Sequence, residues 1–167
     1  VGFRAHLSAQ DALLQITHDV LYDTIPHLTE AILAVDLTMA FDRVQRASIL
    51  RELPALQVGP KTYNYVRAFL TGRSASLHID QLSTTPYTLG GLGNPQGAVL
   101  SPHLFNIDLI PFAQKLNVIP HLMHTLYADN ITTSTTHGSD GEIEETTIST
   151  RHHLRSRMIY RARMLSV

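Results

Sequence analysis

Two short apolar segments that each run into an aspartate restrict the fold of this chain more than any other sequence feature. Residues 31–35 read Ala-Ile-Leu-Ala-Val and end at Asp36. Residues 121–127 and 131–136 flank Ala128-Asp129-Asn130, which predicts a tight hairpin with Asp129 at its tip. A short apolar run bounded by polar residues is typical of a strand buried in a sheet. We therefore expect a sheet in which two strand ends carry a carboxylate.

Apolar residues at helical spacing predict helices before and between these strands. They cover about residues 9–22, a segment after Phe41 that stops before Pro54, the segment from Pro60 to Gly72, and about residues 100–116. At the start of the first helix, Ser8 and Asp11 have the spacing of a capping box. The chain therefore mixes helices and strands, as an α+β protein does.

Between the third and fourth helices the pattern changes to strands and a loop. Residues 74–80 alternate polar and apolar side chains, which predicts a strand with one solvated face, and residues 84–89 are expected to pair with it. Residues 90–97 contain four glycines and one proline. Such a loop turns sharply or brings its backbone close to another group.

Residues 140–167 differ from the rest in charge order. Acidic residues at 140–145 give way to arginines, and apolar residues recur at near-helical spacing, which predicts a charged helical tail. This tail would either contact phosphates of a nucleic acid or form a solvated helix face. Its arginines are Arg151, Arg155, Arg157, Arg161 and Arg163.

Composition excludes several classes of protein. The chain has 167 residues, of which 44% are hydrophobic, and this suits a folded domain rather than a disordered segment. The net charge of −1 means that nucleic acid would have to bind a local basic patch. The absence of cysteine rules out disulfides and thiolate chemistry. No apolar segment is long enough to span a membrane. Because the first methionine is Met39, we expect the chain to be a fragment of a longer reading frame.

The two aspartates have two explanations when the residues alone are considered. Carboxylates that converge repel one another unless a cation lies between them, and Mg²⁺ prefers such hard oxygen ligands. An aspartate at a strand end is also a common turn former. With a cation, either a hydrolase or a nucleotidyl transferase is consistent with Asp36 and Asp129. Zinc ligands are a weaker alternative, at His121 with His124 or at His152 with His153, and surface or packed histidines are the better interpretation.

Three motifs occur in order along the chain: AVDLTMAFDRV at 34–44, GNPQGAVLSPHLFN at 93–106 and YADN at 127–130. Together they resemble motifs A, B and C of reverse transcriptases, most closely those of non-LTR (LINE-type) retrotransposons. The opening Gly2-Phe3-Arg4 and residues 8–14 resemble the segment before motif A. The resemblance spans most of the chain. It implies a ferredoxin-like antiparallel palm sheet with helices packed on one side, in one partial domain over 1–167 with incomplete fingers and no thumb.

The resemblance also implies roles for individual residues. Asp36, the carbonyl of Leu37 and Asp129 would hold two Mg²⁺ or Mn²⁺ ions. Phe41 would select deoxynucleoside triphosphates; the alternative is that it is simply a core aromatic. Gln96, in a loop shaped by Pro95 and Gly97, would lie beside the incoming nucleotide; the alternative is that it is an ordinary loop amide. The implied partners are an RNA template, a DNA primer and deoxynucleoside triphosphates, with no membrane. Tyr127 and the tail arginines are weaker candidates for nucleic-acid contact.

Asn130 departs from the family pattern. It stands where a second aspartate is usual, so the catalytic set becomes Asp36, Asp129 and Asn130, and an amide offers oxygen without negative charge. The family's basic fingers residues are expected before Val1, and its thumb and motif D lysine after Val167. Two functions therefore stay open: a fragment of an RNA-directed DNA polymerase that uses two-metal nucleotidyl transfer, or a catalytically inactive retrotransposon remnant that binds RNA.

Overall fold

The computed structural model describes residues 6–21, 31–135, 140–155 and 160–166. The chain divides into two units, one built from residues 1–40 and 109–167 and the other from residues 41–108. The division falls within helix α4 (Ser101–Leu116), which contributes residues to both units.

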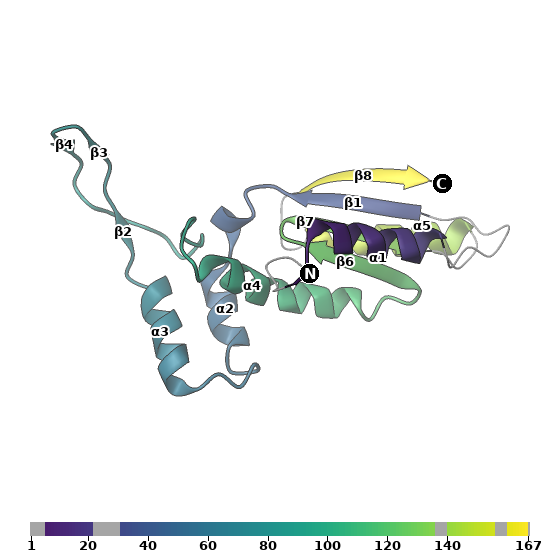
Figure 1. Ribbon diagram of the computed structural model, residues 1–167, viewed down its shortest axis with the longest axis horizontal. Helices are drawn as coiled ribbons and strands as arrows, with labels where there is room; N and C mark the ends of the chain where they lie inside the picture. Colours follow the sequence, from purple (N-terminus) through teal and green to yellow (C-terminus); the bar gives the residue numbers. More distant parts are fainter. Residues whose placement is uncertain (1–5, 22–30, 136–139, 156–159, 167) are drawn as a thin grey trace. The chain divides into compact units, whose positions relative to one another are not determined.

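The first unit is built on a four-stranded antiparallel sheet in the order β6-β7-β1-β8 (Figure 1). Its strands are β1 (Ala31–Leu37), β6 (Leu122–Tyr127), β7 (Asn130–Thr135) and β8 (Tyr160–Ser166). Along β1, Leu33, Val35 and Leu37 are buried, whereas Asp36 is exposed. Side chains alternate between the faces of a sheet, so Asp36 lies on the face opposite the buried leucines and valine. The predicted strand at 31–35 and the predicted hairpin are confirmed.

Two helices pack on this sheet: α1 (Ala9–Leu21) contacts β6 and β7, and α5 (Asp140–Arg155) contacts β1. Helix α1 begins as its sequence predicts, because Asp11 Oδ2 accepts hydrogen bonds from the Ser8 backbone N at 2.6 Å and from its Oγ at 2.7 Å. These bonds lower the pKa of Asp11. Helix α5 buries Ile143, Thr147 and Thr150, which lie along one face at helical spacing.

The prediction of a helical tail over 140–167 is wrong for its last part. Residues 160–166 form β8, which pairs antiparallel with β1 over its whole length. Arg161 and Arg163 alternate with Ala162 and Met164, a period of two that suits a strand. The open edge of β1 supplies the backbone partners that this segment needs, and tertiary pairing therefore overrides the helical spacing.

The second unit contains η1 (Phe41–Arg43), α2 (Arg46–Glu52), α3 (Pro60–Leu70) and residues 101–108 of α4. Pro60 opens α3, and Gly72 follows its end with a φ of +62°, the left-handed conformation that favours glycine there. The helices predicted from apolar spacing are therefore confirmed. None of the helices in the described ranges has the length and hydropathy of a membrane span.

Residues 71–89 form a narrow arm that extends from the end of α3 (Figure 1). It contains two short ladders, β2 (Ser74–Ala75) with β5 (Tyr87–Thr88) and β3 (His78–Ile79) with β4 (Leu82–Ser83). The predicted pairing of the two segments is confirmed, but the prediction of a single solvated face is wrong. Every residue from 74 to 88 is exposed, including Leu77 at 60% and Leu82 at 77%, because two strands alone cannot bury a face.

The central position of Ile131 gives a test of the sheet. Ile131 is fully buried in β7, opposite Val35 on one side and Leu126 on the other. We expect Ile131→Ala to lower the free energy of unfolding by about 2–5 kcal/mol, since it removes buried methyl groups and leaves a cavity. Ile148→Ala in α5 is the matched control, because Ile148 is 57% exposed, and it should change stability by less than about 1 kcal/mol. Equal losses in urea unfolding would contradict the described core.

Candidate active site

The sheet of the first unit brings Asp36 and Asp129 to neighbouring positions. Asp36 in β1 is the register partner of Asn130 in β7, and the Leu37 backbone N donates a hydrogen bond to the Asp129 carbonyl at 2.9 Å. Asp129 lies in the turn between β6 and β7, where Ala128 adopts a φ of +51°. The turn is therefore held against the end of β1, with Asp36 exposed and Asp129 half-buried.

Asn130 and Tyr127 extend this arrangement into a row across three strands. Tyr127 in β6 is the register partner of Asn130, which in turn is the partner of Asp36. Paired residues in neighbouring strands point to the same face of a sheet. The Asn130 Nδ2 donates a hydrogen bond to Asp129 Oδ1 at 3.4 Å. An aspartate at position 130 could not make this contact and would instead add a third negative charge to those of Asp36 and Asp129.

In the second unit, the glycine-rich loop is bonded to the segment that follows β1. The Gly93 N donates to the Val44 carbonyl at 2.9 Å and the Asn94 N donates to the Phe41 carbonyl at 2.8 Å. Gly93 has a φ of +85°, and a Cβ there would come within 3.3 Å of the Asp42 carbonyl oxygen. The predicted close backbone approach is confirmed, since a side chain at position 93 would be strained.

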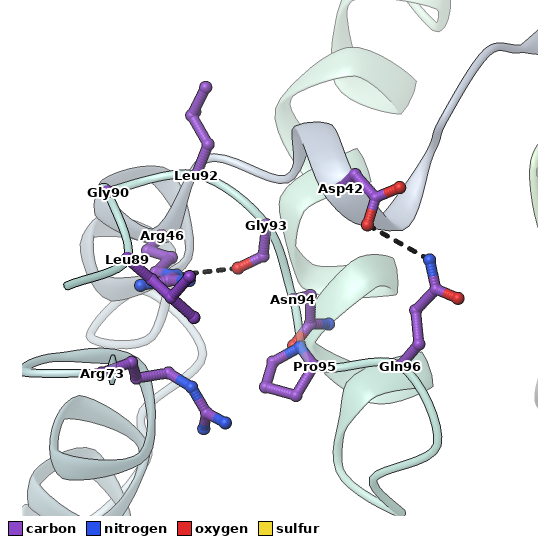
Figure 2. Close-up of a pocket in the computed structure, with 10 residues that line it drawn as sticks. All are labelled: Asp42, Arg46, Arg73, Leu89, Gly90, Leu92, Gly93, Asn94, Pro95 and Gln96. Atoms are coloured by element: carbon purple, nitrogen blue, oxygen red, sulfur yellow. Dashed lines mark hydrogen bonds between the residues drawn. The ribbon is translucent and has the colours of Figure 1, made fainter. Parts of the chain in front are cut away.

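The part of this loop that carries Gln96 is held from two sides. Gln96 Nε2 donates to Asp42 Oδ1 at 3.1 Å, a contact between two exposed side chains (Figure 2). The Ser101 Oγ, at the start of α4, donates a hydrogen bond to the Pro95 carbonyl. Gly97 turns the chain with a φ of +81°. The loop therefore presents the Gln96 amide from a fixed backbone.

Phe41 is fixed by another aromatic side chain of the second unit. Its ring stacks on that of Phe105, with 5.0 Å between centroids and 23° between planes. Phe105 is fully buried and Phe41 is half-buried, so part of the Phe41 ring reaches the surface. Stacking restricts the rotation of such a ring. The predicted selection of deoxynucleotides by Phe41 stays a prediction.

Sequence reasoning missed two buried polar residues that hold the loop. Arg46 is 8% exposed; its Nε donates to the Gly93 carbonyl at 2.7 Å and its Nη1 to the Leu70 carbonyl at 3.2 Å. Asn94 is 3% exposed, and its Nδ2 donates to the Ser101 carbonyl at 2.6 Å. No local pattern marks either residue, because their partners lie in other elements.

A family model described as "Reverse transcriptase (RNA-dependent DNA polymerase)" matches residues 2–160, which is most of the chain. The chain belongs to the reverse transcriptase family. It is also 30% identical over 103 residues to the retrovirus-related Pol polyprotein from type-1 retrotransposable element R2 of Popillia japonica, covering 62% of this chain and 14% of the polyprotein. The resemblance to reverse transcriptases of non-LTR retrotransposons is thus confirmed.

Telomerase structures are among the solved structures that resemble this reverse transcriptase chain. Apo telomerase from Candida tropicalis, truncated from its C-terminal domain, matches with a TM-score of 0.68 and 9% identity over 96% of this chain and 35% of that chain. Telomerase of the same organism in complex with a TWJ fragment of telomeric RNA matches with a TM-score of 0.65 and 9% identity. This match covers 95% of this chain and 29% of that chain. At this identity the likeness concerns the fold, which is a mixed helix and sheet fold. The chain spans about a third or less of these relatives.

The oxygen atoms at the end of β1 suit a reverse transcriptase cation site. Asp36 and Asp129 supply carboxylates, Leu37 a carbonyl and Asn130 an amide oxygen, all hard ligands of the kind that Mg²⁺ prefers. Within the described residues no group of three or more His, Cys, Asp or Glu side chains converges. Mg²⁺ is commonly held by one or two carboxylates together with substrate phosphates. These residues therefore fit a cation whose remaining ligands come from the substrate.

The tail arginines are placed only in part. Arg151 and Arg155 lie in α5, Arg161 and Arg163 lie in β8 at the register positions of Asp36 and Ala34, and Arg157 lies outside the described residues. A basic helix that carries all five arginines is therefore not what this chain forms.

The half-buried His124 in β6 makes stability depend on pH. Burial disfavours the imidazolium, so the pKa of His124 falls below its ordinary value of 6.5. Just below pH 6.5, His124 binds a proton in the unfolded chain but stays neutral in the folded chain, which favours unfolding. The stability that depends on a neutral His124 is therefore present above pH 6.5 and is lost as the pH falls from 6.5 towards the pKa of the folded chain. We expect His124→Gln to flatten the dependence of unfolding free energy on pH as the pH falls below 6.5. An unchanged slope in urea titrations would contradict the burial of His124.

Proposed function

We propose that this chain is the partial catalytic domain, palm with part of the fingers, of an RNA-directed DNA polymerase. The observation that carries the proposal is the pairing of β1 with β7, which joins the strand ends of motifs A and C. Asp36 lies opposite Asn130, and the Leu37 N is bonded to the Asp129 carbonyl. Two carboxylates at adjacent strand ends, in a chain of this family, are suited to nucleotidyl transfer.

A ferredoxin-like palm is part of the proposal for the first unit. The strand β1 is followed by helices, the hairpin of β6 and β7, helix α5 and strand β8. This order, with the sheet order β6-β7-β1-β8, supports a β-α-β-β-α-β arrangement. The face of β1 that bears Asp36 would be the catalytic face.

In the proposed reaction, a primer 3′-hydroxyl attacks the α-phosphorus of a deoxynucleoside triphosphate and pyrophosphate leaves. Asp36 and Asp129, with the Leu37 carbonyl, would hold two Mg²⁺ or Mn²⁺ ions. When bound, these ions supply Lewis-acid activation of the hydroxyl and neutralisation of charge on the leaving group. The half-buried Asp129 carboxylate is oriented by the Asn130 amide.

The second unit would supply contacts to the nucleotide. Gln96, tied to Asp42 at 3.1 Å, offers an exposed amide from a loop whose shape depends on Pro95 and Gly97. Phe41, stacked on Phe105, offers a rigid ring edge that would exclude a ribose 2′-hydroxyl. The expected partners are therefore an RNA template, a DNA primer and deoxynucleoside triphosphates.

Primer extension tests this function in a protein that contains the chain together with fingers and thumb segments. Asp36→Asn and Asp129→Asn should each lower the rate about 100-fold or more, because each removes charge where the reaction needs it. Asp80→Asn is the matched control, since Asp80 is an exposed carboxylate at the turn of the arm and should leave the rate unchanged. Full activity in either of the first two variants would contradict the proposal.

The alternative is a catalytically inactive remnant that binds RNA, and the amide at position 130 favours it. The Asn130 contact to Asp129 replaces a negative charge with a hydrogen-bond donor, which weakens attraction for a cation. Extension by the natural sequence would rule out this alternative. If only the Asn130→Asp variant extends a primer, the loss of polymerase activity is assigned to Asn130. If neither protein extends a primer, the inactive remnant is favoured.

A further inference from the structure

Two arginines of the second unit line one pocket beside the glycine-rich loop (Figure 2). The pocket has a volume of about 430 Å³, within the range of small-molecule sites. Arg46 reaches it from α2 and Arg73 from the base of the arm. Asp42 and loop residues 89–90 and 92–96 form the rest of its lining. None of these residues is one of the two aspartates of the proposed cation site.

The charges around this pocket are unbalanced. Burial, and then repulsion from Arg73, lower the pKa of Arg46 from its ordinary value. In the part of the chain that the structure describes, neither guanidinium forms an ion pair with a carboxylate. Asp42 is the acid in the lining, and its Oδ1 accepts from Gln96. Two cations that face one pocket without a partner anion are the arrangement expected of an anion site.

The guanidinium groups also keep hydrogen-bond donors free for a ligand. Arg46 uses Nε and Nη1 on the Gly93 and Leu70 carbonyls, and within the described residues its Nη2 makes no hydrogen bond. This Nη2 is therefore left to bind a ligand in the pocket that Arg46 lines. Arg73 uses only Nη1, on the Phe69 carbonyl at 3.1 Å, and lies 5.3 Å from the centre of the Phe69 ring, which restrains it.

We propose that the pocket between Arg46 and Arg73 binds the phosphate group of a nucleotide or of a nucleic-acid strand. Arginine forks match phosphate oxygens in geometry as well as in charge. The apolar side chains of Leu89, Leu92 and Pro95 provide a surface for the sugar or base attached to that phosphate. This binding needs no metal ion, and it extends the proposed function to a second site that lies within the second unit alone.

Binding by the 167-residue chain in the presence of EDTA tests the proposal. The probes are a fluorescent single-stranded RNA with a 5′-hydroxyl, followed by anisotropy, and a deoxynucleoside triphosphate, followed by calorimetry. Arg73→Gln should weaken binding about tenfold or more, because it removes charged hydrogen bonds to phosphate. Arg67→Gln is the matched control; Arg67 is exposed on α3, and its loss changes the net charge equally. The Arg73 side chain makes one hydrogen bond, to the Phe69 carbonyl of α3, so the fold should tolerate its replacement.

Asp42→Asn gives a change of opposite sign that a folding defect would not produce. It removes the acid from the lining and leaves an oxygen for Gln96, so binding should tighten about two- to fivefold, the effect of one partly screened charge. If the variants change the binding of RNA alone, the phosphate belongs to a nucleic-acid strand. If they change the binding of the triphosphate alone, it belongs to a free nucleotide. Either result supports the site. Absence of binding, or equal binding by the Arg73 and Arg67 variants with both probes, would overturn it. Because EDTA is present, failure of the metal-dependent reaction would not alter these outcomes.

Discussion

The antiparallel pairing of β1 with β7 is the interaction on which the rest of the first unit depends. Val35 and Leu37 are buried and Asp36 between them is exposed, so the alternation along β1 sets which face carries the carboxylate. A slip of one residue would move Asp36 to the buried face and expose Val35. The position of Asp36 opposite Asn130, next to Asp129, is therefore maintained by the same apolar contacts that stabilise the sheet.

Backbone pairing has the same role in the second unit. The glycine-rich loop is bonded to the segment after β1 through Gly93 and Asn94, and the buried Arg46 joins this loop to the last carbonyl of α3. Such bonds fix the loop backbone and leave Gln96 exposed on it, within hydrogen-bond distance of the exposed Asp42 of η1. The charge that Arg46 brings into the interior also gives the neighbouring pocket its cationic character.

Periodicity in the sequence was enough to predict β1, the β6–β7 hairpin and most helices, because the spacing of apolar residues is a local signal. The motifs were enough to predict the family and to single out Asp36, Asp129 and Gln96. The same reasoning failed for β8, whose pairing with β1 is a tertiary effect that competes with helical spacing. It also gave no sign that Arg46 and Asn94 are buried, since their partners are backbone carbonyls outside their own turn or helix, at Gly93 and Ser101.

Asp36 and Asp129 are proposed to form one cation site at the end of β1, and paramagnetic NMR tests this proposal most directly. Mn²⁺ added to the isotope-labelled chain should broaden the backbone amide signals of residues 36–37 and 128–130 first, because line broadening falls steeply with distance from the ion. Asp36→Asn should abolish this selective broadening. Broadening that begins elsewhere, or that persists unchanged in the Asp36 variant, would contradict the account.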